Sequence, residues 1–163
     1  MKERELTLIK QAILNEIEGY EFYKMAAGQT KSIESKNALL ALADEEFKHS
    51  TYLKELFNKI KKQGDDFQLA FLSDIPSPGI YRFSEINDNA NLSLAVTIFS
   101  IGMEMEKASI KFYEKAFEET ELPEAKKLYE ILIAWEKTHL EQFQTEYARH
   151  REEWWSEQSF APF

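Results

Sequence analysis

The chain has 163 residues, of which 44% are hydrophobic and 30% charged, and its 20 Lys and Arg stand against 29 Asp and Glu. This length suits one compact domain with a core of its own. The formal net charge of −9 argues against nucleic acid and anionic lipid as partners. The chain contains no cysteine, which excludes disulfides, thiol catalysis and cysteine-held metals. Any metal must therefore be held by histidines and carboxylates.

The first residues give no sign of export or membrane insertion. The charged start, residues 1–5, is not followed by an apolar signal segment. The longest apolar runs, residues 38–43 and 131–135, are much shorter than a membrane-spanning helix. We therefore expect a soluble, cytoplasmic protein with no membrane partner.

Four stretches of the chain carry apolar residues at steps of three or four, which is typical of amphipathic helices. The first predicted helix covers residues 6–29. The second has its apolar face from residue 39 onwards and ends at Gly64, a suitable helix C-cap. The third covers about 91–120. The fourth runs from 123 to 151 and begins with a proline, which is favoured in the first turn of a helix.

The segment between the second and third helices, residues 63–91, is long and rich in turn-forming residues. A connection of this length fits a crossover that runs back along a bundle, because antiparallel neighbours need only a short turn. The sequence thus predicts an all-α, four-helix bundle of two helical hairpins over residues 1–150. The aromatic tail, residues 151–163, is expected to dock on the bundle or on a subunit interface.

The second half of the chain repeats the first after a shift of 90 residues. The shift superposes one histidine, two glutamates and an aromatic pair on residues of the same type, so it matches the two hairpins to each other. The matched residues are Glu16 and Glu106, Glu46 and Glu136, His49 and His139, and Phe22-Tyr23 and Phe112-Tyr113.

Each half contains a Glu-x-x-His motif, at residues 46–49 and 136–139. Residues three apart project from one face of a helix, so a carboxylate and an imidazole can reach the same metal ion. A further glutamate, Glu16 or Glu106, precedes each motif by 30 residues on a core-facing stripe. The four glutamates and two histidines are therefore expected to point into the bundle together.

Four carboxylates in an apolar bundle need compensating charge, because burial without it is very costly. Two divalent cations balance four glutamates, and two neutral imidazoles complete the ligand set. Carboxylate oxygen mixed with imidazole suits iron or manganese better than calcium. We expect two iron ions, with manganese or a mixed-metal pair as the alternative.

One glutamate from each of two helices plus Glu-x-x-His from the other two is the ligand arrangement of ferritin-like di-iron bundles. In addition, residues 16–23, 43–49 and 106–113 resemble the rubrerythrin branch of that superfamily, and the resemblance covers roughly residues 5–150. It implies that Glu46 and Glu136 bridge the metals. It likewise implies terminal roles for Glu16 and Glu106, one nitrogen ligand each from His49 and His139, and hydrogen bonds from Tyr23 and Tyr113 to the ligand shell. Plain core packing is the alternative for the two tyrosines.

The same resemblance implies a non-haem di-iron oxidoreductase that reduces hydrogen peroxide or dioxygen. Rubrerythrins proper also carry a four-cysteine iron site, which this chain cannot form, so a separate electron-donor protein is expected. They place an extra glutamate where this chain has Ser109. The alternatives are a ferroxidase that handles iron, as ferritins do, and a non-catalytic, metal-loaded helical protein. A homodimer is the expected assembly.

Three residues near the motifs have plainer expected roles. Glu45 should point away from the cluster, toward solvent or a lysine. Trp135 should be a packing residue. The third histidine, His150, has no glutamate three residues before it and lies among charged residues, so a surface position is expected.

Overall fold

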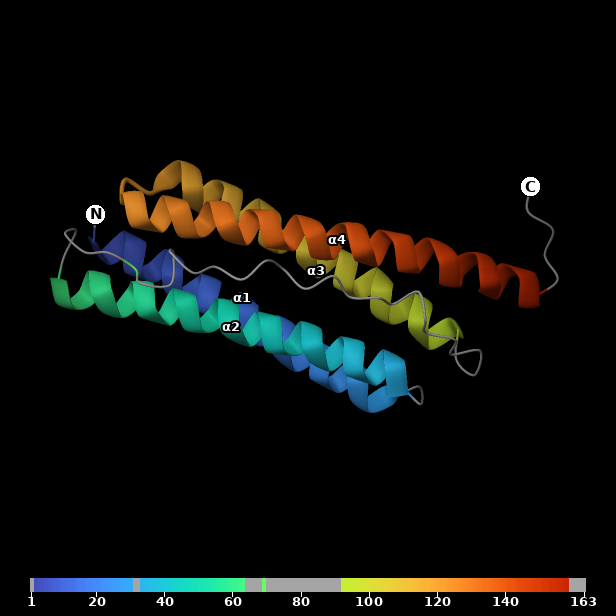
Figure 1. The fold of residues 1–163 in the computed structure, drawn as a ribbon. Coiled ribbons are helices and arrows are strands. Elements are labelled where there is room, and N and C mark those ends of the chain that lie inside the picture. Colours follow the sequence, from blue (N-terminus) through green and yellow to red (C-terminus); the bar gives the residue numbers. More distant parts are fainter. Residues whose placement is uncertain (1, 31–32, 64–68, 70–91, 159–163) are drawn as a thin grey trace.

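The structure, a computed structural model, describes residues 2–30, 33–63, 69 and 92–158. Over these residues it is an all-α four-helix bundle, as predicted (Figure 1). The helices are α1 (Lys2–Gln29), α2 (Ile33–Gln63), α3 (Leu92–Glu119) and α4 (Pro123–Glu157). None of these described helices is both long and apolar enough to cross a membrane.

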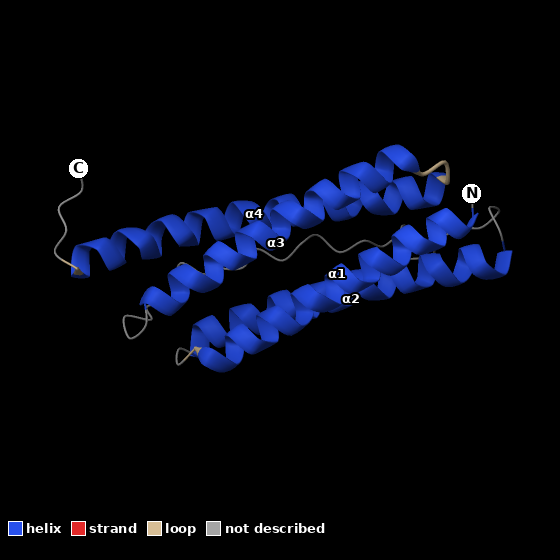
Figure 2. Ribbon diagram, turned by 180° about the vertical axis from the view of Figure 1, so that it is seen from behind, coloured by secondary structure: helices blue, strands red, loops and turns tan. Residues whose placement is uncertain are grey.

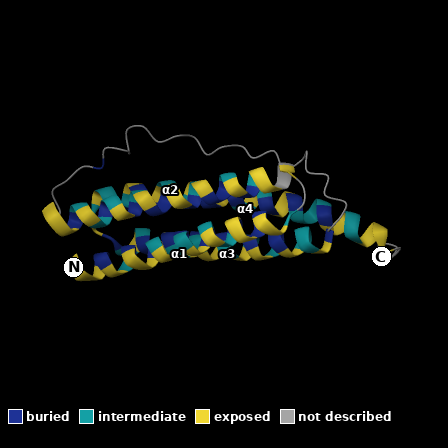
Figure 3. Ribbon diagram, turned by 90° about the horizontal axis from the view of Figure 1, so that it is seen from below, coloured by how far each residue is buried: buried dark blue, intermediate teal, exposed yellow. Residues whose placement is uncertain are grey.

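The bundle consists of two antiparallel hairpins. Helix α1 packs along α2, helix α3 packs along α4, and α1 also meets α3. The start of α1 and the α3–α4 turn lie at one end of the bundle, as both the front and the back view show (Figures 1 and 2). Buried residues line the sides of the helices that face the interior, and exposed residues lie on the outside (Figure 3).

The apolar core is divided into two clusters along the bundle axis. The cluster nearer the α3–α4 turn includes Ile9, Leu56 and Leu128, and the other includes Leu42 and Phe143. In every helix, the glutamate or the Glu-x-x-His motif singled out by the repeat lies between the residues of the two clusters. The polar residues thus form a middle layer with apolar packing on both sides.

The helix ends differ from the predicted ones by a few residues. Helix α1 begins at Lys2, four residues early, because acidic residues in a first turn interact favourably with the helix dipole even without apolar periodicity. Helix α4 begins at Pro123 as predicted. It continues to Glu157, so the first seven residues of the predicted tail are helical.

Several predictions concern residues outside the described ranges. Gly64, most of the predicted crossover and the last five residues of the tail are among them. Leu69 of the crossover is described, and it is buried in the cluster nearer the α3–α4 turn.

Helices α3 and α4 approach closely at Gly102. A Cβ atom at this position would lie only 3.0 Å from Cε2 of Phe143. The Phe143 ring is itself packed between Tyr23 and Phe99, at centroid distances of 5.7 and 5.8 Å. The ring therefore has little room to move away from a side chain at position 102.

We predict that Gly102→Ala destabilises the protein by about 1–3 kcal/mol relative to Gly28→Ala, because it overpacks this contact. Gly28 lies in the same kind of helix, but a Cβ there meets nothing within 4 Å. Gly102 lies in the interior of α3 and gains the full helix propensity of alanine, whereas Gly28 in the last turn of α1 gains less, so the measured difference is a lower limit of the packing cost. Urea unfolding of the metal-free proteins measures it, and equal midpoints would show that Phe143 yields freely.

Candidate metal centre

The six residues singled out by the repeat meet in the middle layer of the bundle. Helices α1 and α3 each contribute one glutamate, and α2 and α4 each contribute a Glu-x-x-His pair from a single helix face. All six are buried, with at most 4% of their surface exposed. They are Glu16, Glu46, His49, Glu106, Glu136 and His139.

The six residues form two overlapping groups, each able to hold a metal ion. One group is Glu16, Glu46, His49 and Glu136, and the other is Glu46, Glu106, Glu136 and His139. Within each group, one potential ligand atom per residue lies within 4.8 Å of all the others. Both groups contain Glu46 and Glu136, so two ions held there would share these two carboxylates.

In the first group, the ring of His49 faces three carboxylates through one nitrogen. Its Nδ1 lies 3.1 Å from Glu16 Oε2, 3.3 Å from Glu136 Oε1 and 3.6 Å from Glu46 Oε2. Glu16 and Glu46 belong to the same hairpin as His49, whereas Glu136 comes from the other hairpin. Three residues of this group thus come from the α1–α2 hairpin and one from the α3–α4 hairpin.

The second group mirrors the first. His139 Nδ1 lies 3.3 Å from Glu136 Oε2, 3.5 Å from Glu46 Oε1 and 3.9 Å from Glu106 Oε2. The two imidazole rings are almost parallel, at a centroid distance of 6.0 Å and an angle of 18°. The 90-residue repeat is therefore also an approximate twofold repeat of the site.

The two shared carboxylates, Glu46 and Glu136, have oxygen atoms that are available to bind a metal ion. Glu46 Oε1 and both oxygens of Glu136 are buried and accept no well-formed hydrogen bond, and the Nδ1 atoms of His49 and His139 lie 3.3 to 3.5 Å from them. A buried carboxylate oxygen without a donor costs free energy of order 1–3 kcal/mol or more. Cations between these oxygens and the Nδ1 atoms would remove this cost, so the residues present fit a pair of metal ions.

The two tyrosines of the repeat cross from one hairpin to the other. The Tyr23 hydroxyl of α1 donates a hydrogen bond to Glu106 of α3, and the Tyr113 hydroxyl of α3 donates one to Glu16 of α1. Burial, and then the nearby carboxylates, raise the pKa of both phenols well above the usual value. Both side chains therefore remain neutral donors at physiological pH, and core packing alone does not describe them.

The four carboxyl groups fall into two kinds. Burial, together with the charges of Glu136 and Glu46, raises the pKa of Glu16 and of Glu106 well above the usual value. Burial acts in the same direction on the shared pair, but contacts with the histidines outweigh it and lower the pKa of Glu136 and of Glu46. In the metal-free cluster the shared pair is thus the ionised pair.

The two histidines are held in their protonated form when the cluster contains no metal. Burial by itself lowers the pKa of each imidazole, but contacts with the surrounding carboxylates raise the pKa of His49 and of His139 well above the usual value. Two imidazolium groups then balance the ionised Glu46 and Glu136. The metal-free cluster is neutral overall when Glu16 and Glu106 hold their protons.

Gly19 makes room for one of the shared carboxylates. A Cβ atom at this position, three residues after Glu16, would lie 3.3 Å from Cγ of Glu46. Its equivalent in the repeat is Ser109, which is partly buried. The backbone of α1 can therefore approach the cluster more closely than a larger residue would allow.

Two residues that directly precede the motifs also touch the site. Glu45 was expected to point away, but its Oε2 lies 3.7 Å from Nε2 of His139 and its side chain is only 17% exposed. The prediction failed because position 45 faces the histidine of the other hairpin, which spacing within one helix does not show. Trp135 is a buried packing residue, as expected, and its ring stacks on His49 at 4.8 Å and 16°.

The predicted surface position of His150 is wrong. The residue is 1% exposed, and its ring stacks on Phe99 of α3 at 5.3 Å and 9°. It lies seven residues after Phe143, so it continues the buried stripe of α4 for two more turns. Its Nε2 accepts a hydrogen bond of 3.0 Å from the Arg149 guanidinium, and its Nδ1 lies 3.3 Å from Glu153 Oε2.

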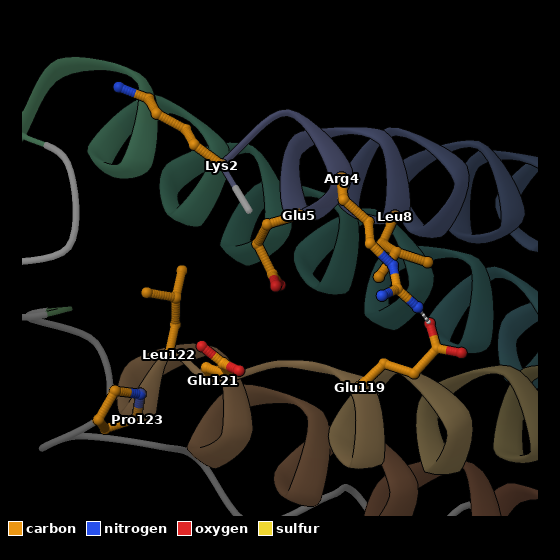
Figure 4. A pocket seen from close by; sticks show the side chains of 8 residues that line it. All are labelled: Lys2, Arg4, Glu5, Leu8, Glu119, Glu121, Leu122 and Pro123. Atoms are coloured by element: carbon orange, nitrogen blue, oxygen red, sulfur yellow. Dashed lines mark ion pairs between the residues drawn. The ribbon is translucent and has the colours of Figure 1, made fainter.

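A cavity of about 370 Å³ lies at the end of the bundle near the start of α1 and the α3–α4 turn (Figure 4). Arg4 and Glu119 form an ion pair of 2.8 Å across it. Glu5 also lines it, and accepts a hydrogen bond of 3.0 Å from the buried Tyr129. Glu5 precedes Glu16 by 11 residues of helix, or about 16 Å. This cavity is thus separate from the glutamate and histidine cluster.

The fold and the cluster together define a ferritin-like bundle with a buried carboxylate and histidine site that could hold metal ions. A comparison with protein families agrees, since the Rubrerythrin family model matches residues 7–147. The chain belongs to the rubrerythrin family. Searches among curated proteins and among solved structures gave no match.

The pKa directions predict how pH affects the metal-free protein. A group whose pKa is raised by folding stabilises the protein at low pH and loses that effect as pH rises. Folding raises the pKa of four such groups, Glu16, Glu106, His49 and His139. We therefore expect the metal-free protein to be less stable at about pH 8 than at about pH 6, by at least about 1 kcal/mol.

Thermal unfolding in the presence of a chelator measures this dependence. The double variant Glu16→Gln and Glu106→Gln is the control, because it replaces the two protonated carboxyl groups by neutral groups of the same shape. It should reduce the slope between the two pH values. A metal-free protein whose stability does not change over this interval would contradict the charge assignment.

Proposed function

We propose that this protein is a non-haem di-iron oxidoreductase that reduces hydrogen peroxide, or dioxygen, with electrons from a separate donor protein. The observation that carries the proposal is the pair of buried groups that share Glu46 and Glu136. A centre that holds two metal ions side by side can deliver two electrons to one small molecule. Membership of the rubrerythrin family supports the same reaction class.

In this proposal the six residues are the metal ligands. Glu46 and Glu136 bridge the two ions, and the other four residues each bind one ion. Their oxygen and imidazole donors suit iron, and also manganese. The formal charges support two divalent ions, because four glutamates then match four positive charges once the histidines have lost their extra protons.

The burial of the cluster limits the size of the substrate. With at most 4% of each ligand exposed, the site suits a diatomic or triatomic oxidant or a peroxide better than an organic molecule. Two bound ferrous ions would supply the electrons of the overall reaction, H2O2 + 2 e⁻ + 2 H⁺ → 2 H2O. The hydroxyls of Tyr23 and Tyr113 hold Glu106 and Glu16 in place throughout.

Electrons must enter from outside the chain in this proposal. The chain has no cysteine and so cannot form a four-cysteine iron site of its own. The donor is therefore a separate redox protein that docks on the surface of the bundle.

Loss of a ligand should lower the metal content. We predict that Glu46→Ala and His139→Ala each bind fewer than two iron ions per chain after anaerobic loading. Glu18→Ala is the matched control, since Glu18 is exposed on α1 two residues from Glu16. Elemental analysis measures the content, and two ions per chain in both ligand variants would refute the site.

Peroxide should oxidise the loaded protein faster than dioxygen does. We expect rapid oxidation of two ferrous ions per peroxide in a stopped-flow experiment, and continuing consumption of peroxide when a reductant is supplied. Faster reaction with dioxygen, with ferric iron accumulating in a particle of many subunits, would instead indicate a ferroxidase. Bound metal without either reaction would indicate a metal-loaded structural protein.

A further inference from the structure

The repeat is broken at the position directly before each Glu-x-x-His motif. Residues 45 and 135 correspond under the shift of 90, but one is glutamate and the other tryptophan. Each lies against the histidine of the opposite hairpin, Glu45 against His139 and Trp135 against His49. The equivalent sequence positions therefore place a carboxylate at the distal nitrogen of one histidine and an indole over the ring face of the other.

The two histidines are oriented by different forces as a result. His139 has carboxylates near both ring nitrogens, since its Nδ1 faces the cluster and its Nε2 lies 3.7 Å from Glu45 Oε2, an ion-pair distance that a shift of a few tenths of an ångström would convert into a hydrogen bond. Among the described residues, the contacts between His49 and carboxylates all involve its Nδ1 atom. Its ring is instead covered by the Trp135 ring, at 4.8 Å and 16°.

A carboxylate behind a metal-binding imidazole strengthens the ligand. It accepts the proton of the distal nitrogen, fixes the ring and its tautomer, and makes the proximal nitrogen more basic. Loss of such a partner typically weakens metal binding by roughly 10- to 100-fold. A stacked indole fixes the plane of a ring through packing, but it contributes no negative charge.

We propose that the two metal positions are unequal, and that the ion at the His139 position binds first and more tightly because Glu45 supports that histidine. Glu45 is then a positioning residue that acts through His139. Trp135 leaves the His49 position as the weaker one. This inference rests on the proposed metal centre, but it does not depend on which oxidant the protein reduces.

The direct test is calorimetric titration of the metal-free protein with Co²⁺, an ion that air does not readily oxidise at such a site. We expect two binding steps whose constants differ by roughly 10- to 100-fold. His139→Ala should abolish the tighter step and His49→Ala the weaker one. Cobalt absorption in the visible range counts the occupied positions independently of any enzyme activity.

Glu45→Ala should weaken only the tighter step, by roughly 10-fold or more. Asp44→Ala is the matched control, because it removes an acidic residue next to Glu45 from an exposed position of α2. It should leave both steps within about twofold of the wild-type values, since exposed charges are screened.

Several outcomes would overturn the inference. A single step with two equal positions would do so, as would equal weakening of both steps in Glu45→Ala, which indicates a general effect of charge. If instead no Co²⁺ binds at all, the metal centre itself fails. Two unequal steps in a protein that does not reduce peroxide would leave the inference standing and refute only the proposed reaction.

Discussion

The burial of four carboxyl groups in the middle of an apolar bundle is the constraint on which the rest of the structure depends. Apolar clusters on both sides of the polar layer provide the hydrophobic stabilisation, and they also exclude the water that would otherwise screen the charges. The layer must therefore balance its own charge. It does so with protons on Glu16, Glu106 and both histidines when metal is absent, and it has the ligands to do so with cations.

The sequence predicted the central part of this site because the relevant information is local and duplicated. Glu46 and His49 are three residues apart, so they lie on one face of their helix. The shift of 90 residues identifies the equivalent pair on a helix of the second hairpin. The fold class follows from the same periodicity. Helix ends were predicted less well, since Lys2 and Glu157 lie in helical turns without an apolar stripe.

What sequence spacing could not show is contact between hairpins. Glu45 and Trp135 lie beside the motifs in sequence, but each touches a histidine of the opposite hairpin. The buried position of His150 likewise depends on Phe99 of another helix. The crossed hydrogen bonds of Tyr23 and Tyr113 belong to the same class, although the repeat did mark both residues. Such contacts are set by how the helices pack together.

Neither hairpin can build a complete ligand group alone, and this bears on how the fold arose. Each group takes three residues from one hairpin and a shared glutamate, Glu136 or Glu46, from the other. If the repeat descends from one ancestral hairpin, that ancestor needed a second copy of itself to form a site, and the two halves of that site would have been identical. Joining the copies in one chain freed each half to change separately. The glutamate at position 45 and the tryptophan at position 135 are then a record of divergence that a symmetric pair of identical chains could not have acquired.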